Sequence, residues 1–459
     1  MAQDGSSASR RIEDGKARRK AVPRAAHTEL GVAKHGRVIV AMLEASNHDR
    51  LEPLVPVRHS RMLESPFAFF RGSAVVQAGD LSDTPSSGIV VQACGDCHLM
   101  NFGGFATPER DLVFDINDFD ETFPAPWEWD VKRLTASLVL AARWKGYTAS
   151  RAADTVAAAA LRYRQMMHEY ADMPTMDVWY SRITYRSLLD RARGNAKVTK
   201  LIATDARRAR SRTAEHVFQK ITTKVGDVPR IVDQPPLIYH PQAADLHGSA
   251  QAVLAKYAET LREDYRAVFA RFRYLDAAIK VVGVGSVGTR CFIVLLQGEH
   301  DDPLFLQIKE ARKSVLQPFT GHSAWTNEGE RVVSGQRLMQ AVSDIFLGWA
   351  RGPRGRDLYV RQLRDMKVSL ELDKVQAEHL VLYGGLCGAA LARAHAKAGR
   401  AQEIAGYLGA GTTFDDALGQ YATGYADQVE HDYEVFRDAT RSGRLKTETS
   451  STPVDVMIS

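Results

Sequence analysis

A glycine-rich loop between two predicted strands constrains the fold of this 459-residue chain more than any other feature. Residues 281–289 read Val-Val-Gly-Val-Gly-Ser-Val-Gly-Thr, and β-type runs lie around the loop at 278–282, 290–296 and 304–308. A dinucleotide-binding glycine loop leads from a strand into a helix, whereas this loop leads into another strand. The sequence therefore argues against a dinucleotide-binding site and predicts a small sheet of sequential strands joined by short turns.

The glycine loop and the strand after it contain the residue types that hold nucleotide phosphates. Gly283, Gly285 and Gly288 would let the backbone approach the phosphates, with Ser286 between them. Lys309 follows about twenty residues later and could pair with the α- and β-phosphates. The alternative for Lys309 is an ordinary exposed strand lysine. The upstream glycine loop favours the nucleotide role.

An acidic residue that orients the lysine is expected at the start of the next predicted helix, residues 328–342. Glu328 and Glu330 both have the required type and position. The sequence does not choose between them.

A second cluster of polar residues lies far upstream, within residues 94–103 and 112–121. Phosphoryl transfer needs a carboxylate that orients the acceptor hydroxyl and takes its proton, and an Asn and an Asp that hold Mg²⁺ on the phosphates. Asp96, Asn101 and Asp118 have these types in this order. One carboxylate and one amide oxygen suffice, because Mg²⁺ keeps much of its water.

These motifs resemble the catalytic segment of aminoglycoside phosphotransferase-like kinases, which reads Gly-Asp-x-His-x-x-Asn and later Asp-Phe/Trp-Glu/Asp. The resemblance implies that Asp118 is the metal ligand, because its twelve-residue spacing to Asp130 matches the family's distance to a structural aspartate. Asp120 is a plausible second ligand, and Asp115 stays an alternative at a strand end. Residues 65–72, 94–103 and 117–129 also resemble the bacterial "domain of unknown function 2252" family, from about residue 50 to about residue 435.

The order of the motifs is reversed relative to an ordinary kinase, because Asp96 comes before the glycine loop in the chain. The resemblance therefore implies a circularly permuted, bilobal protein-kinase-like α+β fold, with a small antiparallel-sheet lobe and a larger helical lobe. Periodicity and turn residues predict further elements: a hairpin turn at 107–111, a helical region from 127 to about 220, a connector at 233–247, a helix from about 250 to 275, a strand at 358–363 and a helix from about 374 to 398. Residues 383–395 are similar to the helix that precedes the catalytic loop in the phosphotransferases. The expected divisions are a disordered basic tail (1–35), the catalytic loop and helical part of the large lobe (36–240), the small lobe (275–370), the helical remainder (371–440) and a flexible tail (441–459).

Charge and composition exclude several other classes of protein. Residues 1–34 hold eight Lys or Arg against four acidic residues, so four of the five net positive charges lie in this segment. The basic run at 207–212 has no interleaved aromatic residues, so specific nucleic-acid binding is not expected. The apolar runs are far shorter than a membrane span, and the first residues do not have the pattern of a secretory signal. A cytoplasmic location is the expectation.

Two further features leave alternatives open. Cys94, Cys97 and His98 could form a redox pair or part of a zinc site, but zinc would need a fourth ligand, and Asp96 lies within the same segment. Arg71 is either a cation on the substrate side or a helix-end charge.

Taken together, the motifs predict an enzyme that uses ATP and Mg²⁺ and transfers the γ-phosphoryl group to a hydroxyl of a small molecule or protein. The rival predictions are a catalytically silent kinase-like protein that binds nucleotide or acts as a scaffold, and a nucleotidyl transferase that uses the same site. The sequence does not identify the acceptor.

Overall fold

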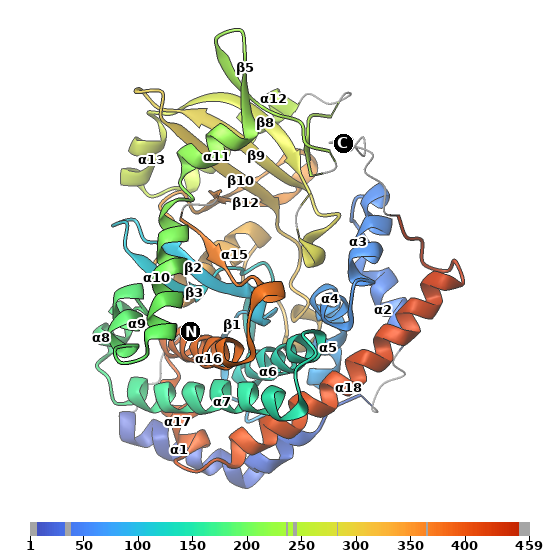
Figure 1. Ribbon diagram of the computed structural model, residues 1–459, viewed down its shortest axis with the longest axis vertical. Coiled ribbons are helices and arrows are strands. Elements are labelled where there is room, and N and C mark those ends of the chain that lie inside the picture. Colours follow the sequence, from blue (N-terminus) through green and yellow to red (C-terminus); the bar gives the residue numbers. More distant parts are fainter. Residues whose placement is uncertain are drawn as a thin grey trace.

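The computed structural model of the chain describes residues 7–32, 38–235, 237–241, 246–281, 283–363 and 366–448. The fold is α+β with antiparallel sheets, and the described helices include none that is long and apolar enough to cross a membrane. In Figure 1 the largest sheet lies at the top and most long helices lie at the bottom.

An antiparallel six-stranded sheet forms where the sequence predicted sequential strands. Its strand order is β11-β12-β10-β9-β8-β7, so the strands on both sides of the glycine loop are neighbours. Side chains alternate between the two faces of each strand, and Ile308 therefore faces away from Lys309. The strands are β7 (Ile238–Tyr239), β8 (Arg273–Lys280), β9 (Cys291–Gln297), β10 (Pro303–Glu310), β11 (Gly348–Arg351) and β12 (Asp357–Gln362).

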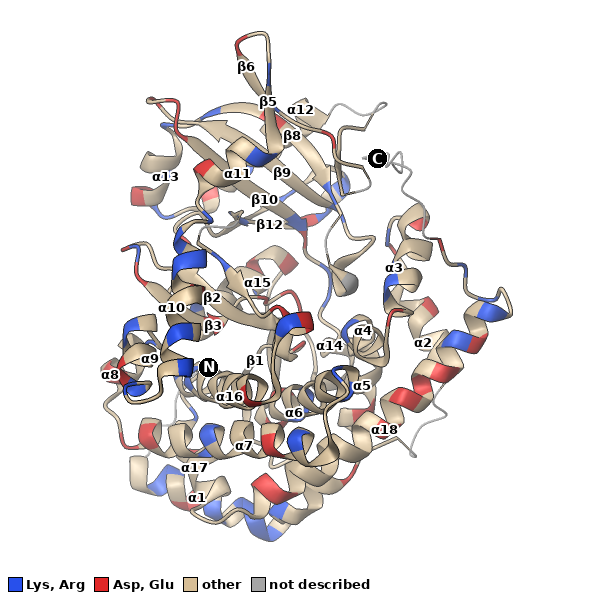
Figure 2. Ribbon diagram, in the orientation of Figure 1, with Lys and Arg blue, Asp and Glu red and all other residues tan. Residues whose placement is uncertain are grey.

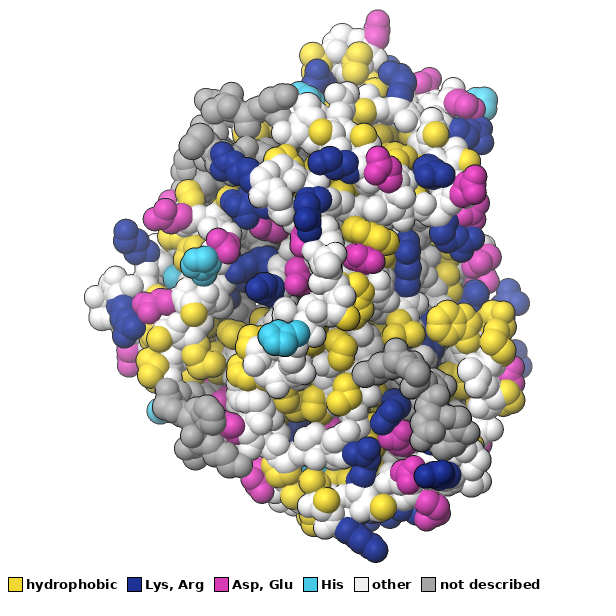
Figure 3. All heavy atoms as spheres, turned by 180° about the vertical axis from the view of Figure 1, so that it is seen from behind, with side chains coloured by type: hydrophobic (Ala, Val, Ile, Leu, Met, Phe, Trp, Pro, Cys, Tyr) yellow, Lys and Arg dark blue, Asp and Glu magenta, His cyan; other side chains and the backbone are white. Residues whose placement is uncertain are grey.

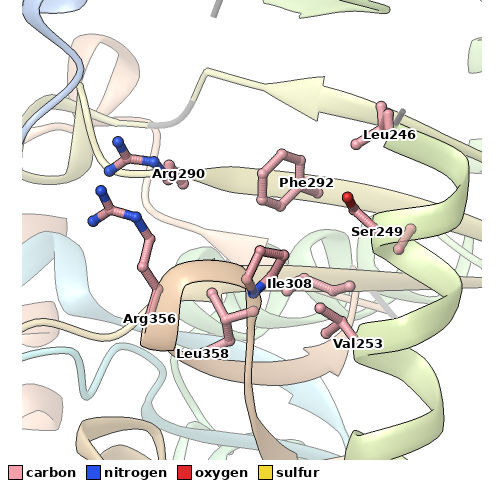
Figure 4. A pocket seen from close by; sticks show the side chains of 10 residues that line it. Leu246, Ser249, Val253, Arg290, Phe292, Ile308, Arg356 and Leu358 are labelled. Atoms are coloured by element: carbon pink, nitrogen blue, oxygen red, sulfur yellow. The ribbon is translucent and has the colours of Figure 1, made fainter. Parts of the chain in front are cut away.

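The face of this sheet that carries Ile308 is covered by α12 (Leu246–Thr260). The sequence predicted one helix from about 250 to 275, but the structure ends α12 at Thr260 and begins α13 (Glu263–Phe269) three residues later. Leu261 is buried between the two helices. A pocket remains between α12 and the sheet, and Figure 4 shows Phe292, Ile308 and Leu358 along it and two arginines at one end.

A small sheet, β13-β2-β3, lies between the large sheet and the helices, beside the β1-β4 pair (Figure 1). The hairpin turn predicted at 107–111 joins β2 to β3. β13 comes from the segment after β12 and pairs with β2. The strands are β1 (Val90–Ala93), β2 (Phe102–Ala106), β3 (Leu112–Ile116), β4 (Phe123–Pro126) and β13 (Val368–Ser369).

The helical part is built around α6 (Trp127–Trp144), α7 (Ala149–Ala171), α16 (Ala377–Lys397) and α18 (Thr413–Arg441). Helix α16 lies directly on α7, although the two helices are far apart in the chain. Glycines permit this approach, because a Cβ on Gly388 would lie 2.2 Å from the carbonyl oxygen of Ala159. The predicted helix at 374–398 is confirmed in this position.

The remaining helices connect and cover these parts. They are α2 (Ile39–Ser46), α3 (Val55–Met62), α4 (Pro66–Gly72), α5 (Ala74–Ser82), α8 (Thr175–Tyr180), α9 (Tyr185–Arg191), α10 (Ala196–Arg210), α11 (Ala214–Ile221), α14 (Gln317–Thr320), α15 (Glu328–Met339) and α17 (Ala401–Leu408). Short 3-10 turns lie at Arg24–Thr28, Glu52–Leu54, Leu99–Asn101, Val284–Ser286, Pro353–Gly355 and Leu372–Lys374.

The described part of the N-terminal segment is ordered, which corrects the disordered tail predicted for 1–35. Helix α1 (Ala8–Ala21) packs on α17, where a Cβ on Gly15 would lie 2.1 Å from the carbonyl oxygen of Glu403. Arg19 donates to the carbonyl oxygen of Tyr407 at 2.8 Å. The basic residues thus serve as hydrogen-bond donors to a helix end, which the charge pattern did not reveal. Residues 1–6 and 33–37 lie outside the described part.

The C-terminal segment predicted as a flexible tail at 441–459 is partly packed. Leu445 is buried, and the carbonyl oxygen of Lys446 lies 2.7 Å from Nδ1 of His59. The backbone N–H of Glu448 donates to Oγ of Ser60 at 2.9 Å. Residues 449–459 lie outside the described part.

The sheet part also begins earlier than the boundary predicted at residue 275. Helix α11 packs on β10, with the rings of Phe218 and Phe305 6.5 Å apart, and β7 adds a strand beyond β8. The β5-β6 hairpin (Thr222–Val225 and Val228–Ile231) joins the same part through the side chain of Asp276, which accepts from the N–H of Ile231 at 2.8 Å. These elements lie in the region 196–260 that the sequence divided between a helical region and a connector.

Candidate active site

Asp130, at the start of α6, fixes the backbone of the loop that carries Asp96. Its carboxylate accepts from the N–H of Cys94 at 2.6 Å and of Gly95 at 2.9 Å. His395 at the end of α16 places Nε2 3.2 Å from the same carboxylate. Gly95 has φ +86°, and a Cβ there would lie 2.2 Å from the carbonyl oxygen of Glu121. The loop therefore has one tightly determined backbone path.

The Asp96 carboxylate lies at the end of this loop between three nitrogen-bearing side chains. Arg133 binds Oδ1, with Nε at 2.6 Å, and His98 places Nε2 3.8 Å from Oδ2. Burial lowers the pKa of His98 to about 3, so its ring is neutral. Arg71 is close enough for the Asp96 charge to act on it. Oδ2 is thus the oxygen of Asp96 that is not bound by Arg133.

Asn101 and Asp118 are held next to this loop. The Asn101 side-chain N–H donates to the carbonyl oxygen of Asp96 at 2.7 Å, so its amide oxygen is the atom that could bind a cation. The carbonyl oxygen of Asn101 accepts from the N–H of Asn117 at 2.9 Å, which brings Asp118 alongside. Burial raises the pKa of Asp118, but the charges of Lys309, Arg361 and Lys367 outweigh burial and lower it. Asp118 is therefore an anion.

The glycine loop and Lys309 meet this upstream cluster at Asp120. Nζ of Lys309 lies 2.5 Å from Oδ2 of Asp120, and Oγ of Ser286 lies 3.4 Å from the same oxygen. Tyr359 donates its hydroxyl to Oδ1. At the base of the loop, a Cβ on Gly285 would lie 3.3 Å from the carbonyl oxygen of Arg71. The structure thus brings together two motif clusters that are widely separated in the sequence.

Lys309 pairs with Asp120 rather than with Glu328 or Glu330, the two partners that the sequence offered. Glu328 is instead bound by Nε of Arg331 at 2.5 Å. Arg331 is fully buried and also donates to the carbonyl oxygen of Asp120 at 2.9 Å. Burial lowers the pKa of Lys309, but Asp120, Tyr359 and Asp118 outweigh burial and raise it, so the lysine is charged.

Both carboxylate oxygens of Asp120 are engaged by Lys309, Ser286 and Tyr359, so in this arrangement Asp120 is a lysine partner and does not present a free oxygen to a cation. Asp115, on β3, is fully buried and is bound by a residue of α16. Nη2 of Arg393 lies 2.7 Å from both of its oxygens. Of the three aspartates, Asp118 is the one whose carboxylate is not paired with Lys309 or Arg393 in these contacts.

A cleft of about 1100 Å³ opens beside this cluster, between the large sheet and the small sheet. Gly283, Gln307 and Arg361 line it from the large sheet, and Asn117 lines it from the segment before Asp118. Nε of Arg361 donates to Oε1 of Gln307 at 3.1 Å. The inner wall of the cleft is therefore polar.

Sequence reasoning missed Arg133, Tyr359 and Arg361. Tyr359 and Arg361 are alternate residues of β12, next to the strand that carries Lys309, so period-two alternation could have placed them on the face of Lys309. Arg133 is also on α6, three residues after Asp130. That spacing could have placed it on the same helix face as Asp130.

The four cysteines are buried and free of disulfides. A hydrogen bond between Cys94 and Cys97, and burial, raise the pKa of the Cys94 thiol, and burial raises that of Cys97 to about 11. Sγ of Cys94 lies 3.5 Å from the carbonyl oxygen of Asp118. In the described residues no three His, Cys, Asp or Glu side chains are grouped as a metal site. This geometry favours a packing role over zinc or redox chemistry.

The pocket beneath α12 (Figure 4) lies on the face of the sheet that carries Ile308, which is opposite the face of Lys309. Its two arginines, Arg290 and Arg356, both bind the carboxylate of Glu310, at 3.2 and 2.9 Å. The lining is otherwise mainly apolar, and no residue of the Asp96 and Lys309 clusters lines it.

Comparison with known proteins gives one positive finding. The sequence model of a family described as "Uncharacterized protein conserved in bacteria (DUF2252)" matches residues 50–439, which include both motif clusters. No curated protein and no solved structure matches the chain.

Proposed function

The chain belongs to the DUF2252 family, and we propose that it is an ATP- and Mg²⁺-dependent phosphotransferase that transfers the γ-phosphoryl group to a hydroxyl. The observation that carries the proposal is the meeting of Lys309 and the glycine loop with the Asp96–Asp120 segment. Each segment alone lacks half of the groups that phosphoryl transfer needs, and Asp120 of the second segment contacts both Lys309 and Ser286 of the glycine loop.

The order of the strands supports a permuted kinase-like fold. The glycine loop joins β8 to β9, Lys309 is on the next strand, and α15 follows before β11 and β12. The chain then passes through β13 into α16, whose His395 contacts Asp130 behind the Asp96 loop. In the proposed fold, α16 is the helix that would precede the catalytic loop in an unpermuted chain, and the loop itself lies far earlier in this sequence.

The proposed reaction uses groups in the cluster for separate tasks. The acceptor oxygen attacks the γ-phosphorus, the bond from that phosphorus to the bridging oxygen breaks, and the electron pair leaves on ADP. Oδ2 of Asp96 takes the acceptor proton, while Arg133 holds Oδ1 and fixes the carboxylate. Lys309 and the loop N–H groups hold the phosphates. Catalysis of this kind rests on positioning and charge stabilisation.

The residues fit a magnesium ion. Asp118 is anionic and the Asn101 amide oxygen is on the adjacent segment, which gives two hard oxygen ligands. Mg²⁺ commonly uses one or two protein oxygens and completes its shell with phosphate oxygens and water. When bound, the ion would neutralise phosphate charge.

Nucleotidyl transfer is a second candidate function, and the charge of the cleft lining is compatible with it. Lys280, Arg361 and Lys367 come from different segments and all line the cleft, so it offers cations for more than one placement of a triphosphate. A catalytically silent nucleotide-binding protein or scaffold is the third candidate.

A thermal-shift titration with ATP and Mg²⁺ tests the proposal, because a ligand that binds only the native state raises its stability. We expect a concentration-dependent rise in the melting temperature that Lys309→Ala and Asp118→Ala each abolish. Lys313→Ala and Asp111→Ala remove the same charges at exposed positions and should leave the rise intact. Wild-type protein that shows no rise would refute nucleotide binding.

Transfer itself is followed with ATP labelled at either the α- or the γ-phosphate. Label from the γ-position on the acceptor or in released phosphate supports phosphoryl transfer, and label from the α-position supports the nucleotidyl alternative. Binding without either product supports the silent protein.

A further inference from the structure

The lining of the cleft is far more cationic than the chain as a whole. Seven Lys or Arg side chains line it against two carboxylates, whereas the whole chain has 60 basic and 55 acidic residues. Basic and acidic side chains are interspersed over the upper half of the face seen from behind in Figure 3. The lining of the cleft therefore differs in charge from this part of the surface. The basic lining residues are Arg61, Arg110, Arg212, Lys220, Lys280, Arg361 and Lys367.

Three of the basic lining residues come from segments other than the glycine loop and the strands beside it, and we call these three the outer cations. Arg212 follows α10, Lys220 is in the last turn of α11, and Lys367 follows β12. Figure 2 shows blue residues on α10 and α11 beside the large sheet. His216 of α11 and Arg110 of the β2-β3 turn also line the cleft.

The backbone fixes two of these cations side by side. The N–H of Met366 donates to the carbonyl oxygen of Arg212 at 3.0 Å, and Nη1 of Arg212 donates to the carbonyl oxygen of Lys367 at 3.2 Å. Arg212 and Lys367 are therefore neighbours in the lining of the cleft.

The two carboxylates of the lining offset only part of this positive charge. Glu371 binds Arg208, outside the lining, and lies 4.0 Å from Nη2 of Arg212. Asp344 accepts from the backbone N–H of Gln362. Each carboxylate is thus shared between the cleft and other donors. A cleft lined by one sign of charge concentrates ligands of the opposite sign.

We propose that Arg212, Lys220 and Lys367 form a second anion site, which binds phosphate groups of a ligand in addition to the phosphates at Lys309. This inference rests on the proposed function for the position of the first phosphates. Two ligands share this chemistry, a nucleotide with a further phosphate on its ribose and a free phosphate chain. Several guanidinium and ammonium groups at one place suit phosphate, which accepts hydrogen bonds on several oxygens.

Binding is measured by calorimetry with two pairs of probes, without Mg²⁺. Adenosine 3′,5′-bisphosphate is compared with AMP, and tripolyphosphate is compared with inorganic phosphate. We expect the wild type to bind adenosine 3′,5′-bisphosphate more tightly than AMP, or tripolyphosphate more tightly than inorganic phosphate, or both. Tighter binding of the bisphosphate identifies a phosphorylated nucleotide as the ligand, and tighter binding of tripolyphosphate identifies a phosphate chain.

The triple variant Arg212→Gln, Lys220→Gln, Lys367→Gln should weaken that binding at least about tenfold, because each lost charge-assisted hydrogen bond is strong. Its control is Lys197→Gln, Lys200→Gln, Arg207→Gln, which removes three exposed charges from α10 outside the cleft lining. Lys220→Gln alone changes an exposed side chain and replaces the triple variant if that variant does not fold. We expect that single change to lower affinity severalfold.

Equal affinity within both probe pairs, or equal weakening by the cleft and control variants, overturns the second anion site. The failure of the proposed function has a different signature. If ATP with Mg²⁺ does not stabilise the wild type while tripolyphosphate binds through the outer cations, the anion site stands and the phosphotransferase proposal falls.

Discussion

Replacing Asp115 by asparagine should unfold this protein more readily without touching its candidate site. The carboxylate and its partner Arg393 are both fully buried, and Nη2 of Arg393 lies 2.7 Å from each oxygen. The N–H of Ala341 also donates to it at 2.6 Å. Asparagine is nearly the same size, so the main change is the loss of one buried charge.

The size of the effect follows from leaving Arg393 charged and buried without its counter-ion. Breaking a buried ion pair by removing one partner costs about 3–5 kcal/mol. The entropy of unfolding is roughly 2.1 cal/mol/K per residue, which gives about 1 kcal/mol/K for a chain of this length. The melting temperature should therefore fall by about 3–5 °C if the chain unfolds as one unit.

The assay is thermal unfolding followed by circular dichroism, with two companion variants. Asp118→Asn removes a partly exposed carboxylate whose cationic neighbours face the cleft. Water can solvate these cations after the change, so we expect the free energy of unfolding to fall by about 1 kcal/mol or less. Adding Arg393→Met to Asp115→Asn replaces the stranded cation with an apolar side chain and should recover much of the lost stability.

A melting temperature for Asp115→Asn within about 1 °C of wild type would refute the reasoning, since the expected fall is several times larger. So would a double variant that is less stable than Asp115→Asn alone. Asp115→Asn should also keep the rise caused by ATP and Mg²⁺, which separates its structural role from the proposed role of Asp118.

The same geometry supports three further predictions. Burial raises the pKa of Glu121 to about 7, so the native state binds more protons than the unfolded chain between about pH 4.3 and 7. The contribution of Glu121 to stability should fall as pH rises through that window, and Glu121→Gln should remove this part of the pH dependence in melting curves at pH 5 and pH 8. Asp130→Asn weakens the acceptor for the N–H groups of Cys94 and Gly95, and should speed amide hydrogen exchange in that loop before it lowers global stability. Ellman's reagent at pH 7.5 should react with essentially none of the four buried cysteines in the native protein and with all four after denaturation. Rapid reaction of Cys94 or Cys97 in the native protein would instead favour redox chemistry.

Much of the fold could be predicted from periodicity. The strands near 290–296, 304–308 and 358–363, the helix at 328–342 and the long helix at 374–398 are confirmed, with ends shifted by a few residues. Such segments bury one face along their whole length, so their apolar residues repeat at the period of the element. The N-terminal helix was missed because its packing uses a glycine and the backbone acceptors of α17, which leave no apolar stripe.

The pairings within the candidate site could not be predicted in the same way. The sequence offered Glu328 and Glu330 as partners of Lys309, and the structure pairs Lys309 with Asp120. Glu328 is bound by the buried side chain of Arg331 and not by Lys309. Which cation meets which carboxylate depends on the relative position of α15 and the Asp118 segment, and no local pattern encodes that position.

The residue types available for chemistry, and the local elements that carry them, could be inferred from the chain alone, because spacing along one strand, loop or helix is a local property. The strand-to-strand glycine loop was enough to argue against a dinucleotide-binding site. Three features became visible only in the folded chain: Ser286 and Lys309 lie against Asp120, Asp115 is a buried partner of Arg393, and cations from several segments line one cleft. These contacts join segments that are far apart in the chain, and their formation depends on how helices and sheets pack, which is fixed by the burial of many side chains at once.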